Sequence, residues 1–190
     1  MPLAFPSHQG LILPLWRWLP GRVDAVALSM GAAMPDIVDG LAAPLRGELG
    51  QWAGHSLLGV ALACTPLGVL LTALLHRLDP LRFVSRADRA TSPPAALSWR
   101  AASVAIGALS HVAFDLVSHG NFLVLWPFIR DRHLFPAFFY VPWRSVKLPI
   151  YREPYPLAPH FIVWVFLSIA GVVLFVREVR RAQERDTAER

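Results

Sequence analysis

Residues 109–120 read Leu-Ser-His-Val-Ala-Phe-Asp-Leu-Val-Ser-His-Gly, and they close an apolar run that begins near Ala101. His111, Asp115 and His119 stand at i, i+4 and i+8, so on an α-helix each is turned by about 40° and raised by about 6 Å from the last. The three side chains therefore share one helix face. Ionisable groups inside a hydrophobic helix are costly to desolvate and usually serve a function. The alternative is a capped helix end that reaches interfacial water, but that reading leaves His111 unexplained.

The composition indicates a membrane protein. The chain has 190 residues, of which 55% are hydrophobic and only 16% are charged, and its mean hydropathy is +0.45. Soluble domains carry about 25% charged residues. We therefore predict a single integral membrane domain over residues 1–190, an all-α polytopic membrane helical bundle with about three spanning helices. Its expected partners are membrane lipids, with homo-oligomers left open.

Charge and cysteine content exclude other classes of protein. The net charge of +5 comes mostly from arginines scattered over loops and the tail, which suits lipid headgroups and topology better than nucleic acid. Cys64 is the single cysteine, so neither an intrachain disulfide nor a cysteine-based zinc site is expected. The N-terminus shows no basic n-region or small-residue cleavage pattern, so we expect no cleaved signal peptide.

The spanning helices are predicted at residues 55–78, 97–119 and 158–177. The first contains nineteen uncharged residues from Leu57 to Leu75, enough to cross a bilayer, and Pro66 should bend it. Residues 120–157 form an aromatic and proline-rich loop typical of a membrane interface or a lid, and residues 178–190 form a charged helical tail.

Residues 1–54 are apolar but interrupted by charged residues and by Pro20-Gly21, so a continuous span is not expected there. We predict two short helices, at residues 11–18 and 23–34, that form an interfacial or re-entrant pair. Residues 34–40 (Met-Pro-Asp-Ile-Val-Asp-Gly) then read as a turn-prone loop that carries Asp36 and Asp39. Turn formation alone is an alternative explanation of these two acids.

Three spans place alternate loops on opposite sides of the membrane. Residues 76–100 and 177–190 share one side and hold ten of the eighteen Lys and Arg residues, whereas residues 1–54 and 120–158 are longer and hold eight. The positive-inside rule makes the first side cytoplasmic. The candidate residues other than His76 then meet at the non-cytoplasmic side, and His76 is assigned no chemistry.

Histidines and carboxylates without thiolates suit a divalent metal ion, most readily Zn²⁺, with Mn²⁺ or Fe²⁺ as alternatives. Such a site lowers the pKa of bound water and delivers hydroxide to a phosphoryl or acyl centre. We expect His55, His111 and Asp115 to bind the metal directly, with His8 and Asp36 completing the shell. Asp39 and His119 are expected to orient the ligands or carry protons in catalysis.

Four blocks of sequence carry a family resemblance. They are Ser7-His8, the residues 34–39, His55-Ser56-Leu57-Leu58, and residues 110–115 followed by Leu125-Trp126-Pro127-Phe128. Over about residues 5–130 the chain resembles small bacterial inner-membrane proteins described as LexA-binding, inner-membrane-associated metal-dependent hydrolases. It also resembles the related uncharacterised membrane family called domain of unknown function 4184 (DUF4184).

The resemblance implies a bacterial inner-membrane location. The charge bias predicts a cytoplasmic C-terminus and a site on the non-cytoplasmic side. The resemblance also implies that the family's metal-site positions correspond to His8, Asp36, His55, His111 and Asp115. Gly54 stands where the family usually has a basic residue, and residues 118–120 depart from its usual Thr and Gly. LexA binding comes with the family description alone, because no residue pattern in this chain supports it.

Three functions remain open from the sequence. The first is a membrane-bound metal-dependent hydrolase that acts on a lipid or lipid-linked phosphoester. The second is a component of a metal-ion or proton transporter or channel that uses the same cluster, since intramembrane Asp and His chains also carry protons and ions. The third is bis-histidine haem ligation, for example by His55 and His111, which would need no aspartate.

Overall fold

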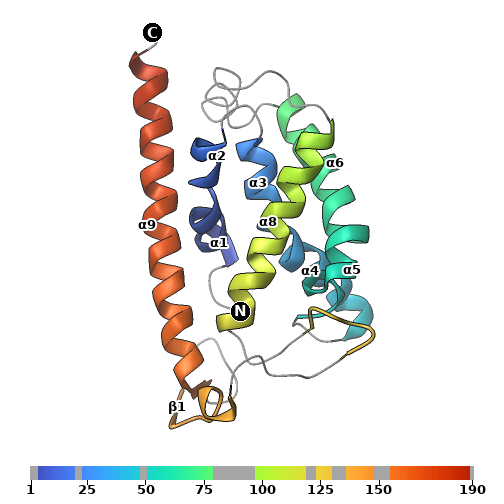
Figure 1. The fold of residues 1–190 in the computed structure, drawn as a ribbon, viewed down its shortest axis with the longest axis vertical. Coiled ribbons are helices and arrows are strands. Elements are labelled where there is room, and N and C mark those ends of the chain that lie inside the picture. The colour runs from blue at the N-terminus through green and yellow to red at the C-terminus, as the bar shows by residue number, and fades with distance from the viewer. Residues whose placement is uncertain are drawn as a thin grey trace.

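The computed structural model describes residues 4–19, 23–47, 51–78, 97–118, 123–129, 136–147 and 155–188. Within them the chain is an all-α membrane helical bundle, as predicted (Figure 1). One small β-hairpin accompanies the helices. The α-helices are α1 (Ala4–Ile12), α2 (Leu15–Trp18), α3 (Ala25–Gly31), α4 (Met34–Arg46), α5 (Leu57–Gly59), α6 (Thr65–Leu78), α8 (Leu97–Ser118) and α9 (Pro159–Ala188). Short elements of other kinds are the 3₁₀ turns η1 (Ala53–His55) and η3 (Ala137–Phe139), the π-helical turn η2 (Val60–Cys64), and strands β1 (Arg144–Val146) and β2 (Tyr155–Leu157).

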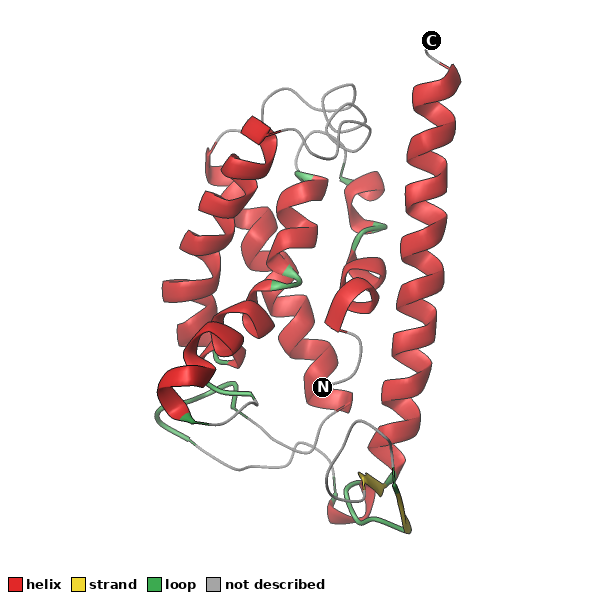
Figure 2. Cartoon of the chain, turned by 180° about the vertical axis from the view of Figure 1, so that it is seen from behind, coloured by secondary structure: helices red, strands yellow, loops and turns green. Residues whose placement is uncertain are grey.

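Three stretches are long and apolar enough to cross a membrane. They are Leu57–Leu78, Leu97–Val117 and Pro159–Arg181, with mean hydropathies of 2.2, 1.3 and 2.3 over their best windows. The prediction of about three spanning helices agrees with these three candidate spans. Helix α9 stands along one side of the bundle and continues unbroken to Ala188, so the charged tail is helical as expected (Figure 2).

Pro66 widens the helix that precedes it. Proline has no N–H to donate, so the turn before it cannot keep the ordinary α-helical bonding. The backbone N–H of Thr65 instead bonds the carbonyl of Val60, five residues back, and its hydroxyl donates to the same oxygen at 2.8 Å. The turn before Pro66 is therefore π-helical, and it lies early in the span.

The N-terminal segment forms four short helices where two were predicted. Helix α1 packs along α9, while α3 is buried against α8. Helices α3 and α4 meet at an angle of 43°, as a broken span or a re-entrant loop. The prediction of a loop at residues 34–40 is wrong: Pro35 stands in the first turn of α4, where its missing N–H costs nothing, and Asp36 and Asp39 lie on that helix.

Small residues allow the inner helices to approach one another closely. A Cβ atom at Gly107 of α8 would collide with the carbonyl oxygen of Leu28 in α3, and one at Gly31 would collide with the backbone of Val104. The small residues of α8 thus admit α3 as a close neighbour. A similar crossing joins Gly10 of α1 to Gly171 of α9.

The turn between α2 and α3 lies at the far end of the bundle from the candidate residues. Asp24, which begins α3, faces His76 at the end of α6 and Arg100 at the start of α8, at 3.3 and 3.4 Å. The pair of helices α3 and α4 therefore spans much of the length of the bundle, which is compatible with the predicted re-entrant pair and also with a broken span. The chain reaches the opposite end near Asp24 and returns through α3 and α4.

The described parts of the predicted aromatic loop contain a small hairpin. Strands β1 and β2 pair antiparallel, with Ser145 opposite Pro156. Residues 123–129 form a separate turn that is fixed to the bundle, because the N–H of Leu57 donates to the carbonyl of Val124 at 2.9 Å. This contact brings the turn next to the start of α5.

Candidate metal centre

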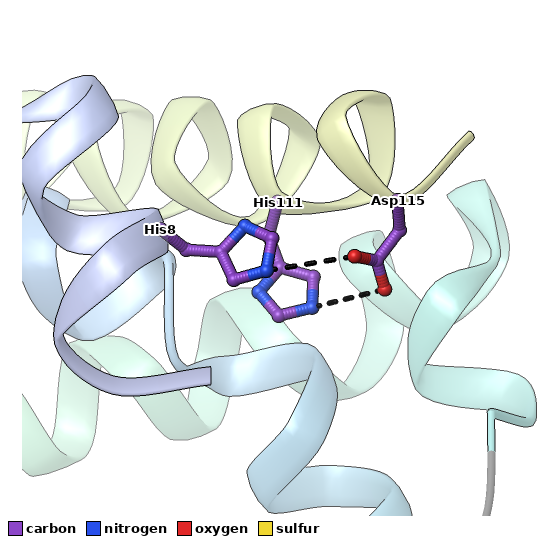
Figure 3. A group of neighbouring side chains, drawn as sticks. All are labelled: His8, His111 and Asp115. Carbon is purple, nitrogen blue, oxygen red and sulfur yellow. Dashed lines mark ion pairs between the residues drawn. The ribbon is translucent and has the colours of Figure 1, made fainter. Parts of the chain in front are cut away.

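Four elements bring the predicted ligands to one place in the bundle. His8 comes from α1, Asp36 and Asp39 from α4, His55 from η1, and His111 and Asp115 from α8. Figure 3 shows His8, His111 and Asp115 turned toward one another. Two overlapping groups have ligand atoms within 4.8 Å of one another: His8, His111 and Asp115, and Asp36, His55 and His111. His119, the remaining predicted site residue, lies outside the described residues.

His111 is held in one tautomer by the break between α3 and α4. Its Nδ1 lies 2.8 Å from the carbonyl oxygen of Ala32, at the end of α3. A carbonyl can only accept a hydrogen bond, so Nδ1 carries the proton. In the neutral ring Nε2 is then a bare lone pair, and the ring is buried with 1% of its surface exposed.

Asp39 holds His55 in the same tautomer. Its carboxylate lies 2.7 Å from Nδ1 of His55 and accepts the backbone N–H groups of Trp52 and Gly54 at 2.5 and 2.7 Å. These donors stabilise the ionised carboxylate, so it accepts the proton at Nδ1, and in the neutral ring Nε2 of His55 is then the free lone pair. Ser56 fixes the turn by capping α5, because its hydroxyl accepts the N–H of Gly59 at 2.9 Å.

The two bare nitrogens face each other among carboxylate oxygens. Nε2 of His55 lies 3.2 Å from Nε2 of His111. Oδ2 of Asp115 lies 3.2 and 3.5 Å from these nitrogens, and Oδ1 of Asp36 lies 3.6 and 3.7 Å from them. Ligands 2.0–2.1 Å from a tetrahedral zinc ion are about 3.4 Å apart. The measured separations are close to that value.

His8 forms the outer wall of the cluster. Its ring stacks on that of His111 with centroids 4.0 Å apart, and its Nε2 lies 3.5 Å from Oδ1 of Asp115 (Figure 3). Asp115 thus presents one oxygen to His8 and the other to His55 and His111. The geometry brings His8 beside the ligand set, bridged to it by Asp115.

Gln51 belongs to the site and was missed from the sequence. Its side-chain amide donates to Oδ2 of Asp115 at 2.5 Å. Gln51 lies in an irregular stretch before η1, where no periodicity relates it to α8. The carbonyl of Ala32 was missed for a similar reason, because a backbone acceptor leaves no signal in the residue pattern.

The electrostatics of the site favour a positive charge at its centre. Burial alone would lower the pKa of His55, but hydrogen bonds to Asp115 and Asp39 and the nearby charges of Asp115 and Asp36 raise that pKa to about 9. The cluster therefore attracts a cation strongly, whether a proton or a metal ion.

The family comparison covers nearly the whole chain. A family model described as a domain of unknown function (DUF4184) matches residues 1–186. No curated protein and no solved structure matches the chain. The predicted resemblance to this uncharacterised family is confirmed, and the resemblance to the hydrolase family stays a prediction. The chain belongs to the DUF4184 family.

Proposed function

We propose that the protein is a membrane-bound, metal-dependent hydrolase whose metal ion is held by Asp36, His55, His111 and Asp115. One observation carries the proposal. The Nε2 atoms of His55 and His111 lie 3.2 Å apart while both Nδ1 atoms are engaged elsewhere. Two lone pairs at that distance repel each other unless a proton or a metal ion lies between them. A divalent metal ion satisfies both nitrogens and the adjoining carboxylates together.

The donor set favours a particular group of metals. Imidazole and carboxylate ligands suit Zn²⁺, Mn²⁺ and Fe²⁺, and zinc is the first choice because the ligand separations suit its bond lengths. The lone cysteine, Cys64, is buried and its sulfur lies 3.5 Å from the carbonyl oxygen of Gly54. The proposed shell therefore contains no thiolate, which favours a catalytic over a purely structural ion.

A metal ion in such a shell supplies hydroxide at neutral pH by lowering the pKa of bound water. The side chains of the chain have separate tasks. Asp39 fixes the orientation of His55 and raises its basicity, while Gln51 fixes Asp115. Asp36 has 19% of its side chain exposed, more than the other proposed ligands, so its side is the approach for substrate. Because the cluster adjoins membrane spans, a lipid or lipid-linked phosphoester is the proposed substrate.

The packing supports a hydrolase over a transporter. A buried apolar cluster that includes Ala27, Val104 and Ala108 lies between the candidate centre and the polar group around Asp24 at the other end. The two polar groups are separated by about eight residues of α3, or about 12 Å. A proton or ion path would have to cross this packed layer. Proteoliposomes that show metal-ion or proton flux dependent on His111 would favour the transporter instead.

The orientation and the membrane are part of the same proposal. Arg177, Arg180 and Arg181 lie in the last turns of the span Pro159–Arg181, whose C-terminal part lies at the same end of the bundle as the start of α8 (Figure 1). The positive-inside rule places this end in the cytoplasm and the candidate centre on the opposite face of a bacterial inner membrane.

Metal analysis of the purified protein tests the proposal directly. We expect the wild type to retain about one divalent ion per chain, and His111→Ala and Asp115→Ala to lose it. His76→Ala is the matched control, because His76 also faces a buried carboxylate but lies at the other end. An unchanged metal content in both site variants would contradict the proposal. Hydrolysis of lipid phosphoesters that requires the metal and His111 would then separate an enzyme from a metal-binding protein.

A further inference from the structure

The π-helical turn η2 divides the first span into a part that contacts the candidate centre and a part that contacts α8. We infer that Thr65 and Pro66, which impose this turn, are positioning residues of the candidate metal centre, because the turn sets the face that the preceding segment presents to the residues around His55. This inference rests on the proposed function and names residues that lie outside the ligand set.

The segment before the turn is fixed to the element that carries His55. A Cβ atom at Gly59 would collide with the carbonyl oxygen of Ala53 in η1. The sulfur of Cys64, at the end of η2, lies 3.5 Å from the carbonyl oxygen of Gly54 in the same element. The orientation of this segment therefore decides where η1 places His55 relative to the other ligands.

The segment after the turn is fixed to a different part of the bundle. A Cβ atom at Gly68 would collide with the side chain of Val104 in α8. Thr72, one helical turn further along, is fully buried, and α6 packs against both α3 and α8. The two halves of the span thus pack against separate neighbours, so a change in their relative rotation would break one set of contacts.

An ordinary α-helix would not keep both sets of contacts. The buried positions of the span recur every four residues, at Val60, Cys64, Gly68 and Thr72. In an α-helix each step of four residues turns the face by about 40°, so the buried face would drift by about 120° over three steps. A π-helical turn closes its hydrogen bond over five residues instead of four and so accommodates an extra residue. The wider turn reduces the drift, and both halves of the span face the bundle.

Pro66 acts through the backbone. Its side chain is exposed, so its replacement removes no core contact. Proline cannot donate the α-helical hydrogen bond to the carbonyl four residues back, and alanine can. A residue with a structural role alone would therefore be replaced by alanine without harm to metal binding, whereas replacement of a positioning residue would weaken it.

The Zn²⁺ affinity of the full-length protein in detergent tests the inference, by competition with a chelator of known affinity. We expect Pro66→Ala to weaken Zn²⁺ binding by about 10-fold to 100-fold, because the preceding turn can then close as an ordinary α-helix and the ion must restore the wider turn. The upper value corresponds to the cost of about 3 kcal/mol that proline imposes on a helix interior. Thr65→Val, which removes the hydroxyl bond to Val60, should show a smaller loss. Pro44→Ala is the matched control, because Pro44 is also an exposed proline inside a helix but no π-helical turn precedes it in α4.

A deletion provides a second test, which a generally damaged fold would fail. Removal of the exposed Ala61 takes one residue out of η2, so an ordinary α-helix would again turn both halves of the span toward their neighbours. We expect the Ala61 deletion combined with Pro66→Ala to bind Zn²⁺ nearly as tightly as the wild type does. Co²⁺ bound in its place should give the wild-type visible absorption spectrum in the combined variant and an altered one in Pro66→Ala alone.

The outcomes separate this inference from the proposed function. A Pro66→Ala protein with wild-type Zn²⁺ affinity overturns the inference and leaves the metal centre standing. A combined variant that binds Zn²⁺ no better than Pro66→Ala overturns the role of the turn in setting the face of the span. A wild type that binds no Zn²⁺ overturns the proposed function, and with it the inference.

Discussion

The chain buries two polar groups at opposite ends of α3 and α8, and they differ in charge balance. At one end Asp24 has a partner for each oxygen: Oδ1 accepts the N–H of Ala27 at 2.8 Å, and Oδ2 faces His76 and Arg100. Its own N–H donates to Ser103 at 3.0 Å. This group joins α3, α6 and α8 and neutralises its carboxylate internally, as a structural polar contact does.

The candidate metal centre at the other end has a different composition. Three carboxylates and two histidine Nε2 atoms converge there, and among the described residues no Lys or Arg side chain makes an ion pair with Asp36 or Asp39. Both groups are buried, so burial does not distinguish them. Their charges do distinguish them. A buried carboxylate that faces cationic side chains needs no additional cation, whereas several buried carboxylates around two histidines favour the binding of one.

Metal removal should lower the stability of the protein through the candidate metal centre and not through the group around Asp24. This is the largest expected effect. A metal ion at 1,000 times its dissociation constant stabilises the folded state by about 4 kcal/mol. We expect the chelator-treated wild type in detergent to gain this stability when Zn²⁺ is restored, and thermal unfolding before and after the addition measures it. His55→Ala should show almost none of it, and Asp24→Ala should show all of it. Equal gains in the two variants would mean that the ion binds elsewhere.

Asp39→Asn should weaken metal binding without abolishing it. The substituted amide would keep an oxygen for the backbone N–H groups, but the negative charge that holds His55 would be lost. Loss of such an outer partner typically lowers metal affinity by about 10-fold to 100-fold. Competition with a chelator of known affinity measures the change. Asp24→Asn is the matched control, and a comparable loss in that variant would remove the distinction between the two ends.

Asp24→Ala should lower stability by about 1–2 kcal/mol without changing metal affinity, because α3 loses its N-cap and Arg100 and His76 lose their partner. Asp24→Asn keeps a capping oxygen and should cost less than alanine does. Thermal unfolding of the metal-free proteins compares the two. A metal affinity that falls together with stability would show that the two groups are coupled through α3 or α8.

The sequence predicted the spans and the set of converging residues well, because both depend on local patterns. Apolar length reveals a span, and the i, i+4 spacing of His111 and Asp115 puts them on one helix face. Asp36 and Asp39 were expected in a loop because Pro35 reads equally well as a helix stop or a helix start. Only the packing of α4 against η1 decides between the two.

The contacts that complete each polar group could not be read from the residue pattern. Asp24 and His76 are 52 positions apart, and His76 looked like an ordinary helix end. The tautomer of His111 depends on a backbone carbonyl, which exists at every position, and the break at Ala32 makes this one available. Long-range partners and backbone acceptors are set by tertiary packing.

The stability of the metal-free protein should depend on pH through His55 in the candidate metal centre, and the expected change is small within any one pH unit. The folded-state pKa of His55 is about 9, above its ordinary value of 6.5, so protonated His55 stabilises the fold fully below pH 6.5. That contribution should fall by at most about 1.4 kcal/mol per pH unit as the pH rises from 6.5 to 9. Thermal unfolding of the metal-free wild type across this range measures it, with His55→Ala as the control that lacks the slope. Metal affinity should rise over the same range, because the ion displaces the proton on His55. A metal-free protein whose stability rises toward pH 9 would contradict a centre that needs a cation.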